Sequence, residues 1–240
     1  MTDTPQRRFA STHWSLVKAA ADTETESGRQ ALDRLFRLYW YPLYLFLRRQ
    51  GLPEKDAEDL LQGFFVQAME KGLLETADPE RGRFRTYLLA SLQNYLANHY
   101  RAQKAIKRGG QVAIHSLNLE SAEERYRQEP ATTLTPEEAF ERKWAQTVVQ
   151  QAVDQLGKEW AEPGKHEVFQ ALRNLLVGQT SEETYQQIAE RLGKSETAIK
   201  VTMHRLRKRC GELIRNEIAA TVCTDQEVES ELMRLFEVLG

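Results

Sequence analysis

The stretch "YQQIAERLGKSETAIKVTMHRLRKR", Tyr185 to Arg209, decides the fold. It holds two short helical patterns, and Gly193 between them tolerates the positive φ that ends a helix. Ser195 is a good N-cap for the second helix. Two short helices at this spacing predict a helix-turn-helix. The apolar residues lie on one face of each predicted helix: Ile188, Ala189 and Leu192 on the first, and Ile199, Met203, Leu206 and Cys210 on the second.

The second of these helices is strongly basic, although the chain as a whole has 33 Lys and Arg against 35 Asp and Glu. One-sided positive charge favours DNA binding over an ordinary helical hairpin with a solvated charged face. We expect residues near the helix start to meet base edges and later ones to contact phosphates. His204 can equally be a plain surface histidine. The first set is Thr197, Lys200, Val201 and His204, and the second is Arg205, Arg207, Lys208 and Arg209.

Charge is segregated along the chain. A first basic island, Arg83–Arg108, holds six basic residues and no acid, and a second basic island spans Lys194–Arg209. Between them, the acidic connector Glu120–Glu141 has seven acids against two basic residues, and the acidic tail Glu217–Gly240 has six against one. Two basic islands suggest two surfaces that face a polyanion. An inhibitory contact between the islands and the acidic tail is a further hypothesis that rests on charge alone.

Helical periodicity recurs throughout the chain and β-type alternation is nearly absent, which predicts an all-α fold. The sequence contains neither an apolar run of membrane-spanning length nor a signal segment. The two cysteines, Cys210 and Cys223, form no ligand-spaced pair, and no set of residues has the pattern of a catalytic site. We therefore expect a reduced, cytoplasmic, non-enzymatic protein that holds no metal or cofactor.

The pattern of helices divides the chain into five segments. We expect an N-terminal extension over 1–28, a first helical domain over 29–108, a flexible linker over 109–135, a second helical domain over 136–218 and an acidic C-terminal helix over 219–240. Gly109 and Gly110 stop the last helix of the first domain. Thr135 is a good N-cap for the second domain, with Glu138 three residues later. The apolar residues of the extension predict packing onto the first domain, or else a regulatory contact: Phe9, Trp14, Leu16 and Val17.

Two helices of the first domain carry notable polar faces. The helix from Arg83 presents an aromatic residue, two amides and an arginine on one narrow face: Tyr87, Asn94, Asn98 and Arg101. Such side chains can stack on and hydrogen-bond to unstacked bases, although a packed Tyr87 on a solvated face is the simpler interpretation. The helix before it points Lys55, Glu58, Asp59 and Gln62 outward, where first-turn acids also complement the helix dipole.

Together these pieces follow the order and spacing of a known family. From Ala31 to Leu213 the chain resembles a bacterial RNA polymerase sigma factor of the extracytoplasmic-function (ECF) group of the sigma-70 family. Three motifs that concur make the resemblance specific, whereas an isolated helix-turn-helix would be weak. The motifs are "DAEDLLQGFF" from Asp56, "RFRTYLLASLQNYLANHYR" from Arg83 and, after a linker, the stretch from Tyr185.

The resemblance implies two small helical domains, sigma region 2 and a region 4 helix-turn-helix, joined by a linker that threads towards the polymerase active-site channel. Region 2 docks on the clamp helices of the polymerase β′ subunit at the positions of Asp56, Glu58, Asp59 and Gln62. It recognises and melts the minus-ten promoter element at the positions of Tyr87, Asn94, Asn98 and Arg101. Region 4 touches the β flap and reads the minus-thirty-five element at the positions of Ser195, Thr197, Lys200, Val201, His204, Arg205 and Lys208.

The implied partners are core RNA polymerase and promoter DNA, and an anti-sigma factor or other regulator is a further partner that the resemblance allows. Departures from the family pattern occur at Val201 and Thr202, where a small polar residue and an arginine are common, and at Gln93, where arginine is common. Two other hypotheses stay open at this point: a helix-turn-helix regulator that binds duplex DNA without polymerase, and an interaction protein that binds a regulator through its termini.

Overall fold

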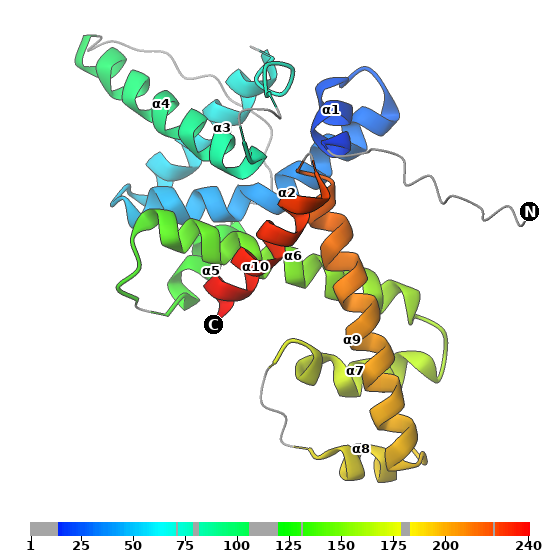
Figure 1. The fold of residues 1–240 in the computed structure, drawn as a ribbon. Helices are drawn as coiled ribbons and strands as arrows, with labels where there is room; N and C mark the ends of the chain where they lie inside the picture. Colours follow the sequence, from blue (N-terminus) through cyan, green and yellow to red (C-terminus); the bar gives the residue numbers. More distant parts are fainter. Residues whose placement is uncertain are drawn as a thin grey trace, which may run out of the picture.

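The computed structural model describes residues 14–70, 72–78, 82–105, 120–130, 132–178, 183–222 and 224–240. Over these residues the regular structure is α-helical and contains no strand, which confirms the all-α prediction (Figure 1). No helix in the described ranges is both long and apolar enough to cross a bilayer. Several predicted features lie outside the described residues: Phe9, the stop at Gly109 and Gly110, residues 111–119 and 131 of the linker, and Cys223.

The N-terminal half is built on α2 (Glu26–Arg49), whose buried side chains are largely leucine and aromatic residues. Helix α1 (Ser15–Ala21) packs along it, so the described apolar residues of the N-terminal extension, Trp14, Leu16 and Val17, serve packing. Trp14 is 1% exposed and lies edge-on to Phe84, with ring centres 5.6 Å apart. Helices α3 (Glu54–Glu70) and α4 (Phe84–Ala105) cover another side of α2.

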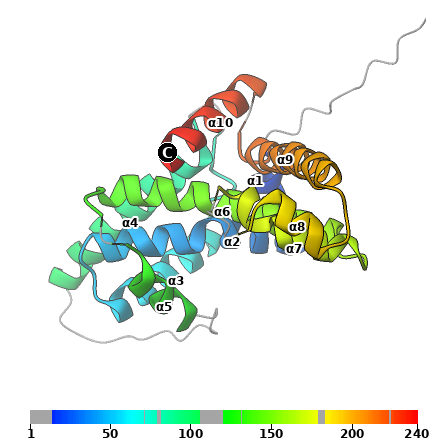
Figure 2. The ribbon, with the colours of Figure 1, turned by 90° about the horizontal axis from the view of Figure 1, so that it is seen from below.

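Helix α6 (Pro136–Glu159) is the central helix of the structure. It starts with the predicted capping box, in which Glu138 N–H donates to Thr135 Oγ1 and Thr135 N–H donates to Glu138 Oε2. Its buried residues face more than one direction, and the helix packs against both α2 and α9 (Figure 2). The helix that opens the predicted second domain therefore packs along the main helix of the first, and residues of both belong to one continuous core.

The C-terminal half consists of α7 (Lys165–Leu176), α8 (Tyr185–Arg191), α9 (Glu196–Ala219) and α10 (Asp225–Leu239). The expected helix of the acidic tail is α10. Figure 1 shows α9 extending out of the body of the molecule with its N-terminal end farthest out, so that α8 and the start of α9 lie at the far end from α4. The C-terminal end of α9 returns to the body, where Arg34 of α2 pairs with Glu217 at 2.6 Å.

Part of the predicted linker is helical. Residues Glu120–Gln128 form α5, which packs on α2. Glu123 is buried at 6% exposure and accepts hydrogen bonds from Tyr44 at 2.6 Å and from Arg48 at 3.1 Å. The weak apolar periodicity of the segment favoured a linker because it gave no sign of this contact. A carboxylate, rather than an apolar stripe, holds α5 in place.

Candidate nucleic-acid interface

The turn between α8 and α9 has the local geometry that the sequence predicts. Gly193 has a φ of +61°, and the Ser195 hydroxyl accepts a hydrogen bond from Ala198 N–H at 3.1 Å. A capping box from Thr184 and Gln187 begins α8. Ile188 and Ile199 are fully buried where the two helices meet. These contacts fix the angle at which α9 leaves α8.

The outward face of α9 is polar and basic. Every residue proposed for base or minus-thirty-five contacts is exposed: Ser195, Thr197, Lys200, Val201, His204, Arg205 and Lys208. Val201 is 45% exposed, which leaves its methyl groups open to a ligand. Lys200 pairs with Glu196 one turn earlier at 2.6 Å, with both side chains largely in solvent.

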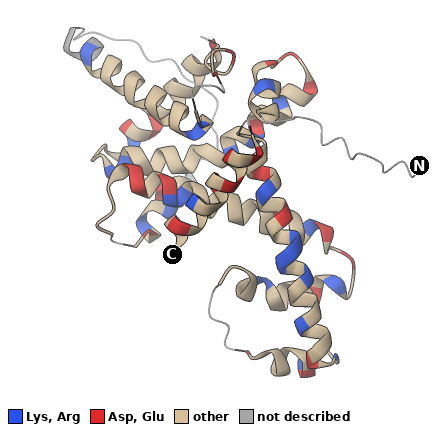
Figure 3. Ribbon diagram, in the orientation of Figure 1, with Lys and Arg blue, Asp and Glu red and all other residues tan. Residues whose placement is uncertain are grey.

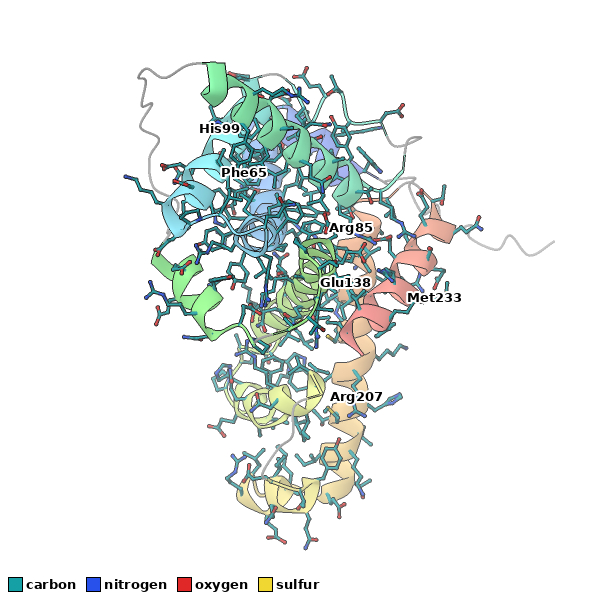
Figure 4. The ribbon with its side chains drawn as sticks, turned by 90° about the vertical axis from the view of Figure 1, so that its left-hand side faces the viewer. Phe65, Arg85, His99, Glu138, Arg207 and Met233 are labelled. Carbon is teal, nitrogen blue, oxygen red and sulfur yellow. The ribbon has the colours of Figure 1, made fainter. Side chains whose placement is uncertain are left out.

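The basic side chains further along α9 differ in their availability. Arg205, Arg207 and Lys208 are exposed and form no ion pair with another described residue, and Figure 4 shows Arg207 on α9. Arg209 instead binds Glu159 of α6 through two hydrogen bonds, and Glu212 at 3.0 Å. The pairing with Arg209 lowers the pKa of Glu159. Of the four expected phosphate contacts, three have no ion-pair partner among the described residues and the fourth, Arg209, is paired.

Helix α4 presents the second polar surface, and it carries no acidic residue (Figure 3). Asn94, Asn98 and Arg101 are exposed, and Arg101 donates to Asn98 Oδ1 at 2.9 Å. Tyr87 lies apart from them at the beginning of the helix. It is half-buried, and its hydroxyl donates to the Leu73 carbonyl at 3.1 Å. The structure thus brings three of the four residues together and packs the fourth against the loop before α4.

A cleft of about 230 Å³ opens between α3 and α4 beside these residues. Tyr95 supplies an aromatic wall, and Gly63 of α3 makes room for it, because a Cβ at Gly63 would lie 2.5 Å from the Tyr95 hydroxyl oxygen. Gln67, Ser91 and Tyr95 were not singled out in the sequence analysis. The signal was the spacing i, i+3, i+4, i+7 from Ser91. The cleft is lined by Phe64, Gln67, Ala68, Leu73, Ser91, Asn94, Tyr95 and Asn98.

The third surface is the acidic face at the start of α3. Asp56 and Asp59 are exposed and form no ion pair with a described residue, whereas Glu58 and Gln62 are partly buried. Burial raises the pKa of Glu58, and the carboxylates of Glu54 and Asp59 raise it further. The start of α3 therefore carries several negative charges that basic residues in the described part of the chain do not fully neutralise.

The two ends of the first basic island differ. Arg83 and Arg85, at the start of α4, are paired with carboxylates of α6 and α10. Gln93 also reaches across to α6, where it donates to Glu137 at 3.2 Å. Arg101 near the other end stays exposed. The expectation that the whole island faces a polyanion therefore does not describe this arrangement, because two of its arginines face carboxylates of the chain itself.

Comparison with known families matches two parts of the chain. Residues 35–106 match the family model described as Sigma-70 region 2, and residues 179–210 match the one described as Sigma-70, region 4. The region 2 match contains α3 and α4, and the region 4 match contains the helix-turn-helix of α8 and the start of α9. They support a sigma-70 family factor with a role in promoter recognition, and they point to a non-catalytic transcription initiation factor. No curated protein and no solved structure matches the chain.

Proposed function

We propose that this protein is an alternative sigma factor of the ECF type, which binds core RNA polymerase and directs it to promoters in the bacterial cytoplasm. The observation that carries the proposal is the presence of sigma-70 regions 2 and 4 in one chain, in that order. Each of these regions carries an exposed polar helix face. A duplex-binding regulator accounts for α8 and α9 only, and it leaves residues 35–106 without a role.

Region 4 reads the minus-thirty-five element by placing the start of α9 in the major groove. Lys200 donates hydrogen bonds to a guanine edge, for which lysine and arginine are the usual partners. Val201 packs its exposed methyl groups against the methyl group of a thymine. Arg205 and Lys208 contact phosphates on either side, and they set orientation and salt dependence rather than sequence preference.

Region 2 holds the unstacked strand of the minus-ten element on α4. Asn94 and Asn98 can both donate to and accept from base edges, and Arg101 supplies positive charge at the same end of the helix. The neighbouring cleft offers Tyr95 as an aromatic wall for a base removed from the stack. The bond from the Tyr87 hydroxyl to the Leu73 carbonyl supports a role for Tyr87 in holding the preceding loop, and a base contact by its ring stays a prediction.

The acidic face of α3 binds the β′ clamp helices. A group of neighbouring carboxylates lowers the stability of the free protein, because like charges repel and a partly buried carboxylate loses hydration. Such a cost is commonly retained where the residues have a function. The raised pKa of Glu58 reflects this cost. A basic partner surface would neutralise Asp56, Glu58 and Asp59 on binding. The β flap, which region 4 touches, and an anti-sigma factor or other regulator complete the proposed set of partners.

The deciding experiment is reconstitution with purified core RNA polymerase. The protein should form a stoichiometric complex and support transcription that starts at specific promoters, whereas the core enzyme alone should not. Failure to form a complex with core enzymes from several bacteria would refute the proposal. Tight, sequence-specific binding of the free protein to duplex DNA, without any polymerase complex, would instead establish the stand-alone regulator.

A further inference from the structure

The acidic C-terminal helix α10 folds back onto the start of α4. Arg83, the first residue of the first basic island, donates to the Ser230 hydroxyl at 2.8 Å and pairs with Glu231. Arg85 pairs with the other carboxylate oxygen of Glu231. Figure 1 shows α10 lying across α6, so the tail joins a helix of region 2 to the central helix of the C-terminal half.

These contacts form a buried charge cluster. Arg85 and Glu231 are 3% and 2% exposed, and the Arg85 guanidinium lies 4.5 Å above the Trp144 ring of α6 (Figure 4). Glu141 of α6 lies 3.7 Å from Arg85 and also accepts from Arg234 of α10. Burial lowers the pKa of Arg85 to about 10, which leaves the guanidinium charged at neutral pH and the pairs intact.

Stability alone is a weak reason to bury such a cluster, because well-packed apolar residues at the same positions are often as stable or more so. The cluster has a second effect. It occupies two of the six basic residues of the first basic island, beside the surface that we propose binds the minus-ten strand. The Arg83 side chain is still 34% exposed, so a phosphate can approach it from solvent. Glu231 and DNA phosphates are therefore alternative partners for the same guanidinium.

The inner and outer faces of α10 differ in burial. Val228 and Leu235 are buried against the body, whereas Met233 and Phe236 are 63% and 65% exposed, and Figure 4 shows Met233 on the outer side of the helix. A helix of 15 residues is marginally stable in isolation. Once its charge contacts are replaced, α10 should leave the body as a largely unfolded segment.

We propose that α10 is an autoinhibitory latch, in which Glu231 competes with DNA phosphates for Arg83 and Arg85 and must leave before the start of α4 can bind DNA. The idea rests on the proposed DNA-binding role of α4. Because competition is reciprocal, whatever weakens the latch strengthens DNA binding, and DNA weakens the latch to the same degree.

The first test compares Glu231→Gln with the matched control Glu237→Gln, which changes the same helix by the same charge at an exposed position. The probe is a fluorescent oligodeoxythymidine, whose binding to the free protein is followed by anisotropy over a range of salt concentrations. Glu231→Gln should bind more tightly, with a log–log salt slope steeper by about 0.7 for each additional phosphate that the released arginines neutralise. Adding Arg83→Gln should remove this increase in affinity. Equal binding by Glu231→Gln and Glu237→Gln would overturn the latch.

A second measurement covers the case in which Glu231→Gln fails to fold, as judged by circular dichroism. Spin labels on Thr86→Cys of α4 and Gln226→Cys of α10, both at exposed positions, report the distance between the two helices in a Cys223→Ser background; Cys210 is buried. Saturating oligodeoxythymidine should lengthen and broaden this distance, and an unchanged distance would rule the latch out. Neither test uses polymerase, so a failed latch is distinguishable from a failed sigma-factor assignment.

Discussion

Arg209 of α9 and Glu159 at the end of α6 form a bidentate pair, with Nε–Oε2 and Nη2–Oε1 distances of 2.9 and 2.8 Å. The pair joins the helix that we propose reads DNA to the central helix of the structure. It also takes Arg209 out of the set of free cations on α9, while its neighbour Lys208 stays exposed. Adjacent basic residues in the sequence thus have different roles.

The first prediction separates these two residues. Lys208→Ala should weaken binding of the holoenzyme to promoter DNA and reduce the log–log salt slope by about 0.9, because one phosphate is no longer neutralised. Arg209→Ala should leave the slope nearly unchanged, since its charge is already paired with Glu159. Binding measured by anisotropy at several salt concentrations distinguishes the two variants. Equal slopes for both would mean that Arg209 leaves Glu159 when DNA binds.

The second prediction concerns the acidic face of α3. The double variant Asp59→Ala and Gln62→Ala should weaken binding to core RNA polymerase and leave the thermal unfolding temperature nearly unchanged, because Asp59 makes no ion pair with a described residue. Glu70→Ala, at the exposed far end of the same helix, is the control. If a competition assay shows unchanged affinity for core enzyme, the acidic residues serve only to complement the helix dipole.

The third prediction is a pH dependence that follows from the raised pKa of Glu58. The folded protein holds the Glu58 proton more tightly than the unfolded chain does. Stability therefore falls as pH rises from the ordinary value of 4.5 through the folded-state pKa, and the loss persists above it. Glu58→Gln should raise the unfolding temperature at pH 7 and have little effect below pH of about 4. A gain of the same size at both pH values would contradict this account, and Glu70→Gln provides the control.

The fourth prediction tests base contact by Lys200. Lys200→Ala should lower discrimination between minus-thirty-five variants by about 1–3 kcal/mol if it binds a base edge. Glu196→Ala breaks the exposed pair with Lys200 but keeps the lysine, so it should retain the sequence preference. Competition binding of the holoenzyme to a panel of promoter variants supplies the measurement. If Lys200→Ala weakens all promoters equally, the residue contacts a phosphate instead.

The fifth prediction distinguishes the role of Ser195 as a helix cap from a role in contacting DNA. Ser195→Ala should destabilise the protein by about 1 kcal/mol, because the Ala198 N–H loses its cap. Ser195→Asp keeps a capping oxygen and should retain the stability, but its negative charge should repel the DNA backbone and reduce promoter affinity. Thermal unfolding and promoter binding are measured on both variants. Unimpaired promoter binding by Ser195→Asp would place Ser195 away from the DNA.

Local patterns allowed much of the fold to be predicted. The cap at Thr135, the turn at Gly193 and the cap at Ser195 each depend on a few neighbouring residues, and all three are confirmed. The helix-turn-helix and its exposed face follow from helical periodicity in the same way. Both sigma regions were also identified from their motifs, and the ECF assignment and the individual contacts stay predictions.

Less predictable was which side chain meets which across the fold. The pairing of Glu123 with Arg48 joins residues that are 75 positions apart in the sequence, and no local pattern predicts it. The cleft at Tyr95 depends on the approach of α4 to Gly63, which only the packing of two helices brings about. A buried carboxylate cannot be distinguished from a solvated one in the sequence, so the segment that forms α5 was predicted to be part of a linker.

The sequence by itself determined that the chain is all-α, where the capped helices at Thr135 and Ser195 begin, and that two basic islands are separated by an acidic connector, because backbone propensity, capping and amphipathic spacing are local properties. Only the tertiary structure decided which of these charges face solvent. Burial and pairing depend on contacts between distant segments, and they leave Arg205 and Lys208 free while they occupy Arg83, Arg85 and Arg209 with carboxylates of the same chain.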